Sequence, residues 1–91
     1  MTHAIVLIQC ERTEIPNLGA TLAGVEGVAE AYSVTGDWDF VAIVRVPRHE
    51  LLADVVTGTI GRLPGVDRTQ TMVAFEVFSQ HDLDALFSIG E

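Results

Sequence analysis

Runs of hydrophobic residues along the chain predict four β-strands and two helices. The strands are expected at residues 3–10, 28–35, 39–46 and 66–78, where β-branched and other apolar residues gather. Between them, apolar residues recur at three- and four-residue spacing, which predicts helices from about 16 to 24 and from about 48 to 62. The predicted order is therefore strand, helix, strand, strand, helix, strand.

The two halves of the chain repeat one pattern. Val25-Glu26-Gly27-Val28 in the first half corresponds to Leu63-Pro64-Gly65-Val66, 38 residues later. The link at residues 36–38 is too short for a parallel crossover, so the two middle strands should form a hairpin. Right-handed crossovers in both halves then predict an α+β, ferredoxin-like βαββαβ fold, with a four-stranded antiparallel sheet and two helices on one face.

The face of the sheet without helices is expected to be hydrophobic too, because the first and third strands carry apolar residues at both odd and even positions. In the second strand, Val28, Glu30, Tyr32 and Val34 are expected to point one way. A second copy packed sheet to sheet would cover this face, so we expect a homodimer. We expect residues 1–91 to form a single domain. Ser79 with Asp82 resembles a helix N-cap pair and predicts a short C-terminal helix.

Composition supports self-association and argues against several partners. Hydrophobic residues make up 48% of a chain of only 91 residues, more than a small monomer easily buries. The net charge is −8 and the five basic residues are scattered, so we expect no direct binding to nucleic acid or to anionic membranes. The single cysteine, Cys10, excludes a disulfide framework, and a cytoplasmic location is the default expectation.

Few residues suggest catalysis. His3, His49 and His81 fall in different elements and show no zinc-ligand spacing, so we expect no metal site. The chain carries no nucleophile elbow and no glycine-rich phosphate loop, so we expect no catalytic residue and no cofactor. The alternative is a dimeric α/β-barrel enzyme such as a small cofactor-free oxygenase, which would need His49 in a pocket between sheet and helices.

The predicted hairpin has the strongest ligand-binding signal. A simple turn would explain Gly36 and one aspartate, since glycine supplies a positive φ and aspartate caps backbone amides. Two acids around a tryptophan suit a zwitterion instead, because amides and hydroxyls can bind a carboxylate and aspartate can bind an ammonium group. The fourth strand adds polar residues that could equally be ordinary exposed strand residues. The candidate ligand-binding residues are Thr35, Gly36, Asp37, Trp38, Asp39, Thr69, Gln70 and Thr71.

The segment from Leu22 to Phe40, which ends in Val34-Thr35-Gly36-Asp37-Trp38-Asp39-Phe40, resembles the effector domain of the Lrp/AsnC (leucine-responsive, feast/famine) regulators. So does Leu63-Pro64-Gly65-Val66 followed by Thr69-Gln70-Thr71. The resemblance covers roughly residues 3–80. It implies dimers formed through their sheets, often assembled into rings, with an amino acid or related small metabolite bound between dimers.

The resemblance also implies roles for these residues. Thr35, Gly36, Asp37 and Asp39 would line the site, Thr69, Gln70 and Thr71 would lie opposite, and Trp38 would shape the pocket or the dimer contact. Full regulators carry an N-terminal helix-turn-helix domain, for which this chain has no room. We therefore expect a stand-alone, non-enzymatic ligand-binding domain that modulates transcription through a partner such as a full-length regulator. A pure oligomerisation module is the remaining alternative.

Overall fold

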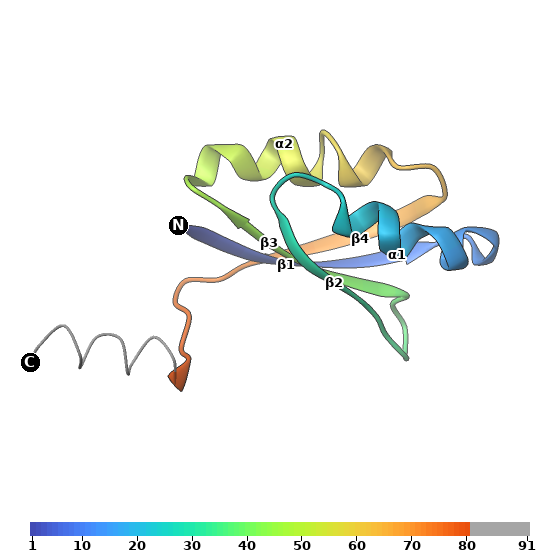
Figure 1. The fold of residues 1–91 in the computed structure, drawn as a ribbon, viewed down its shortest axis with the longest axis horizontal. Helices are drawn as coiled ribbons and strands as arrows, with labels where there is room; N and C mark the ends of the chain where they lie inside the picture. The colour runs from blue at the N-terminus through green and yellow to red at the C-terminus, as the bar shows by residue number, and fades with distance from the viewer. Residues whose placement is uncertain (81–91) are drawn as a thin grey trace, which may run out of the picture.

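The computed structural model describes residues 1–80 and has helices on one face of a four-stranded antiparallel sheet (Figure 1). The strands are β1 (Thr2–Cys10), β2 (Val28–Ser33), β3 (Phe40–Val46) and β4 (Val66–Val73), in the order β2-β3-β1-β4. The helical segments are η1 (Arg12–Glu14), α1 (Ile15–Ala23), η2 (His49–Leu51), α2 (Leu52–Val56) and η3 (Ile60–Arg62). The predicted α+β, ferredoxin-like fold is confirmed. The predicted C-terminal helix, which would follow an N-cap at Ser79, lies almost entirely on residues 81–91, outside the described residues.

The core lies between the helices and the two central strands. Alternate residues of these strands point toward the helices and are buried, namely Ala4, Val6, Ile8 and Cys10 of β1 and Phe40, Ala42, Val44 and Val46 of β3. Leu18 and Leu22 of α1 and Ile60 of η3 complete the core from above. Each fully buried side chain of this size contributes about 1.5–3 kcal/mol. The intervening residues of β1 and β3 face away from the helices.

The second predicted helix is broken into three short segments. A single helix over 48–62 was expected, but α2 is only five residues long and 3₁₀ turns flank it. The break occurs at Gly58 and Thr59, where Thr59 leaves helical geometry at φ −121° and ψ −65°. Glycine and β-branched residues are weak helix formers, and the Thr59 hydroxyl donates a hydrogen bond to the Asp54 carbonyl at 3.1 Å.

A β-bulge changes which side chains of β2 point to each face of the sheet, compared with the prediction. The register with β3 shifts between Val28 and Glu30, which inserts one residue into β2. Val28 and Ala31 therefore pack against the core, whereas Glu30 and Tyr32 lie on the helix-free face. The expectation that Val28 shares a face with Glu30 and Tyr32 was wrong because strict alternation does not hold across a bulge.

The fourth strand is shorter than predicted. It ends at Val73 rather than at residue 78. Its partner β1 begins at Thr2, and the Ala74 amide donates a last hydrogen bond of 2.9 Å to the His3 carbonyl. Within residues 1–80, the chain beyond Ala74 has no further strand to pair with, and it turns down below the sheet (Figure 1).

Two glycines with positive φ provide a matched test of this packing. Gly27 has φ +97°, and a Cβ there would lie 2.8 Å from Val55 Cγ2; Gly36 has φ +101° with nothing within 4 Å of the added carbon. Both alanine variants should lose about 1–2 kcal/mol because L-residues avoid this conformation. Gly27→Ala should lose a further 1–3 kcal/mol or so from overpacking against α2. Equal shifts in urea unfolding midpoints would contradict this packing.

Candidate functional site

The hairpin between β2 and β3 is fastened to the end of β1 by Asp39. The Asp39 carboxylate accepts a hydrogen bond of 2.9 Å from the Cys10 backbone amide, and the Asp39 amide donates to the Ile8 carbonyl, also at 2.9 Å. Charged acceptors strengthen such bonds. Burial raises the pKa of the Cys10 thiol, and the charge of Asp39 raises it further. Cys10 is therefore a protonated packing residue at neutral pH rather than a nucleophile.

The tip of the hairpin presents polar groups to solvent. The Gln9 side-chain amide donates a 2.8 Å hydrogen bond to the Asp37 carbonyl and so supports the tip from β1. Thr35, Gly36 and Asp37 are exposed. Within residues 1–80, no hydrogen bond or ion pair involves the Thr35 hydroxyl or the Asp37 carboxylate. These two groups are free to meet a ligand.

The hairpin also contacts the start of β4, through a residue that the sequence reasoning missed. The guanidinium carbon of Arg68 lies 4.7 Å from the centroid of the Trp38 ring, within range of a cation–π interaction. Trp38 is half-buried and Arg68 is exposed. In the sequence, only its position directly before Thr69 pointed to Arg68. Its contact with Trp38 could not be predicted, because that contact depends on the strand register.

The three predicted β4 residues lie on two different faces. Thr69 pairs with Ile8 and Thr71 with Val6, so both threonines point to the helix side of the sheet. Gln70 pairs with Leu7 and points to the helix-free face. The structure therefore places Gln70 on the same face as Arg68, which lies two residues earlier on β4, while Thr69 and Thr71 lie on the other side of this edge strand.

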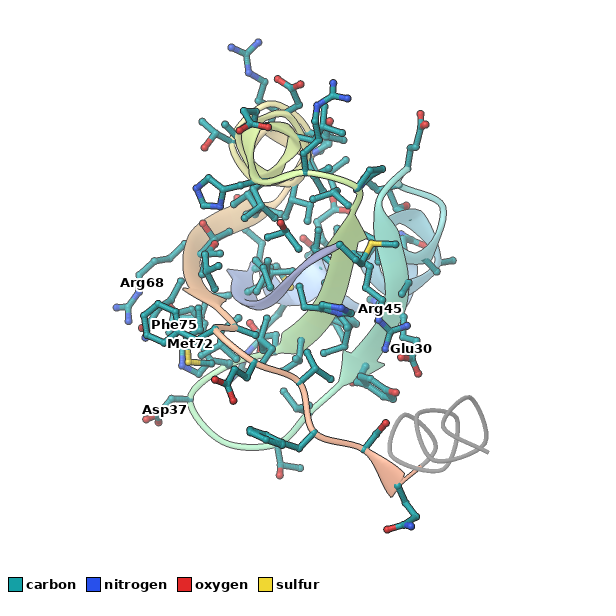
Figure 2. The ribbon with its side chains drawn as sticks, turned by 90° about the vertical axis from the view of Figure 1, so that its left-hand side faces the viewer. Glu30, Asp37, Arg45, Arg68, Met72 and Phe75 are labelled. Atoms are coloured by element: carbon teal, nitrogen blue, oxygen red, sulfur yellow. The ribbon has the colours of Figure 1, made fainter. Side chains whose placement is uncertain are left out.

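The helix-free face is apolar at its centre and carries a polar network at the β2 edge. Its central side chains are Ile5, Leu7, Val41 and Ile43, and Met72 lies on the same face at its more exposed margin. At the edge, the Tyr32 hydroxyl donates to Glu30 at 2.5 Å, and Arg45 lies 3.6 Å from the same carboxylate. The hydrogen bond to Glu30 raises the pKa of the Tyr32 hydroxyl. Figure 2 shows Arg45 and Glu30 across the sheet from Met72 and Arg68.

Two hollows lie elsewhere on the molecule. One, of about 310 Å³, lies on the helix-free face below the segment that follows β4, and Ile5, Ile43, Val77 and Phe78 help to line it. The other, of about 470 Å³, lies between the α2 region and the end of β3, beside Gly27, Val46, Asp54 and Val55. His49 is exposed and does not line this second hollow. The inward-facing histidine that the enzyme alternative needs is therefore not found there.

The described part of the chain contains neither a metal-binding cluster nor a membrane-spanning helix. Within residues 1–80, no three His, Cys, Asp or Glu side chains come together as a metal-binding group. In the same residues, no helix has both the length and the apolar character needed to cross a bilayer.

Comparison with known proteins identifies the family. The model of the Lrp/AsnC ligand binding domain matches residues 3–83. The HTH-type transcriptional regulator FL11 of Pyrococcus abyssi is 30% identical over 77 residues, which cover 85% of this chain and 50% of that protein. The chain thus spans about half the length of the curated relatives it matches.

Solved structures share the fold. The protein TTHA0845 of Thermus thermophilus is 45% identical, with a TM-score of 0.82 and coverage of 88% of this chain and 100% of that one. A feast or famine regulatory protein from M. tuberculosis, solved with L-methionine, is 27% identical over 88% of this chain and 54% of that one, with a TM-score of 0.70. The resemblance read from the hairpin and the start of β4 is confirmed, and the chain belongs to the Lrp/AsnC ligand-binding domain family.

Proposed function

We propose that this domain binds an amino acid or a related small metabolite at its hairpin, without catalysing a reaction. The observation that carries the proposal is the pair of free polar groups on Thr35 and Asp37, held on a hairpin that Asp39 and Gln9 fasten to β1. A hydroxyl and backbone amides suit the carboxylate of an amino acid, and the Asp37 carboxylate suits its ammonium group. The relative solved with L-methionine supports this ligand class.

The binding pocket is completed by another copy of the chain. Neither described hollow is lined by the hairpin, so a single chain supplies only one wall of the site. The helix-free face forms the first contact between two copies, because its apolar centre would otherwise be exposed to water. Phe75 is fully exposed at 103% and Phe78 at 81%, which adds apolar surface beside that face. We infer dimers formed through their sheets, which assemble further into rings with the ligand between dimers.

The domain regulates transcription through a partner. Its named relatives are transcriptional regulators, and the matched half is their ligand-binding part. The net charge of −8 disfavours direct contact with DNA. A full-length regulator of the same family is the proposed partner, because it would present the same apolar sheet face for mixed assembly. The exposed aromatic residues after β4 would serve a pure oligomerisation module equally well, and ligand titration separates the two functions.

Replacing Asp37 tests the ligand site. Isothermal titration of the wild-type protein with the twenty amino acids should give heat with at least one, and Asp37→Asn should weaken that binding about tenfold or more, since charge-assisted hydrogen bonds contribute about 1.5–3 kcal/mol. Thermal stability without ligand should not change, because the Asp37 carboxylate has no partner in residues 1–80.

Asp54→Asn is the matched control, since Asp54 is exposed on α2 and makes no side-chain ion pair in the described part of the chain. It should bind like the wild type. If none of the twenty amino acids gives heat or changes the oligomer mass, or if Asp37→Asn binds normally, the proposal is wrong.

Introducing a charge on the helix-free face tests the assembly. Leu7→Glu at the centre of the face, and Met72→Glu at its more exposed margin, should convert the oligomer into smaller species in light-scattering measurements, because each carboxylate would be buried without a partner. Ala53→Glu adds the same charge to the exposed side of α2 and should leave the mass unchanged. Folded Met72→Glu protein with wild-type mass would exclude this face as the interface.

A further inference from the structure

Arg68 is a cation beside the hairpin that has no ionic partner within residues 1–80. The ion pairs there are Arg45 with Glu30 and Arg48 with Glu50. Its guanidinium carbon lies instead over the indole ring of Trp38, 4.7 Å from the ring centroid. The residue is exposed, so its N–H groups are open to an anion from outside the chain.

The contact with Trp38 restricts the guanidinium group. A guanidinium over the face of an aromatic ring is attracted to the ring, and its N–H donors remain available to another partner. The planar fork of arginine matches the two oxygens of a carboxylate, and an oriented fork loses less freedom on binding than a loose side chain does. Trp38 and Arg68 together therefore form a candidate receptor for a carboxylate.

This receptor lies next to the free groups of the hairpin. Arg68 pairs with Gln9 across the strands, and Gln9 donates the hydrogen bond that supports Asp37. Arg68 and Asp37 lie on the same side of the molecule in Figure 2, away from Arg45 and Glu30. A ligand held by Thr35 and Asp37 would therefore have Arg68 within its surroundings.

We propose that Arg68, oriented by Trp38, recognises a second carboxylate of the ligand, so that the site prefers a dicarboxylic amino acid of the aspartate or glutamate type. This inference rests on the proposed function. Thr35 and the hairpin amides bind the α-carboxylate and Asp37 binds the ammonium group, which leaves Arg68 for a further anionic group. A chain with a net charge of −8 repels such a ligand unless a local cation offsets that repulsion.

Titration calorimetry with aspartate, glutamate, asparagine, glutamine and leucine tests the inference. The wild-type protein should bind one of the acids about tenfold or more tightly than its amide, because the amide lacks the charge that pairs with Arg68. Arg68→Met should remove this preference. Trp38→Leu should reduce it, because the guanidinium group then loses its support.

Arg48→Met is the matched control. This substitution removes the same charge from a residue just beyond the end of β3, which is the end remote from the hairpin. The variant should keep the preference for the acid. The light-scattering mass of each variant is measured alongside, because Arg68 could instead pair with an acidic residue of a neighbouring copy.

Two results would overturn the inference. The first is a wild-type protein that binds the amides or leucine as tightly as the acids. The second is an Arg68→Met variant that keeps the preference. If that variant weakens acid and amide binding by the same factor, Arg68 binds the α-carboxylate; if it changes only the oligomer mass, Arg68 forms a subunit contact. In each of these cases amino-acid binding itself stands, whereas absence of binding by every amino acid would refute the proposed function.

Discussion

Strand β1 carries apolar side chains on both faces and pairs with β3 on one side and β4 on the other. On one face, residues such as Val6 and Ile8 are completely buried under the helices, whereas Ile5 and Leu7 lie on the face without helices. A central strand of this kind needs cover on both sides. The helices supply one cover from within the chain, and the proposed second copy supplies the other.

The end of β1 also organises the candidate site. Asp39 accepts a hydrogen bond from its last amide, on Cys10. The neighbouring Gln9 supports the hairpin tip and pairs with Arg68 on the adjacent strand β4. The side chains of Asp39 and Gln9 therefore fix the backbone of the hairpin, whereas those of Thr35 and Asp37 have no partner within residues 1–80. Because the supporting bonds already hold the free groups in place, a ligand would lose little binding free energy to ordering the hairpin.

Local sequence pattern was sufficient for the fold and for the hairpin. The repeat of Gly-Val before two strands determined the topology, and the short link at Gly36 required a tight turn. Features that depend on register were not predictable in the same way. The bulge beside Val28 turns the Val28 side chain to the opposite face of the sheet, and another register irregularity follows Gln9. The contact of Arg68 with Trp38 joins residues thirty positions apart in the chain. The break at Gly58 shows that a helical stripe of apolar residues does not guarantee a continuous helix.

We propose that the hairpin holds an amino acid at a contact between copies of the chain. A crystal structure determined with the tightest-binding amino acid would show this contact directly. The ligand should lie between two copies, with its ammonium group on Asp37 and its α-carboxylate on Thr35 and the hairpin amides. A ligand found instead in the hollow beside Gly27 and Asp54, with the hairpin unoccupied, would contradict it.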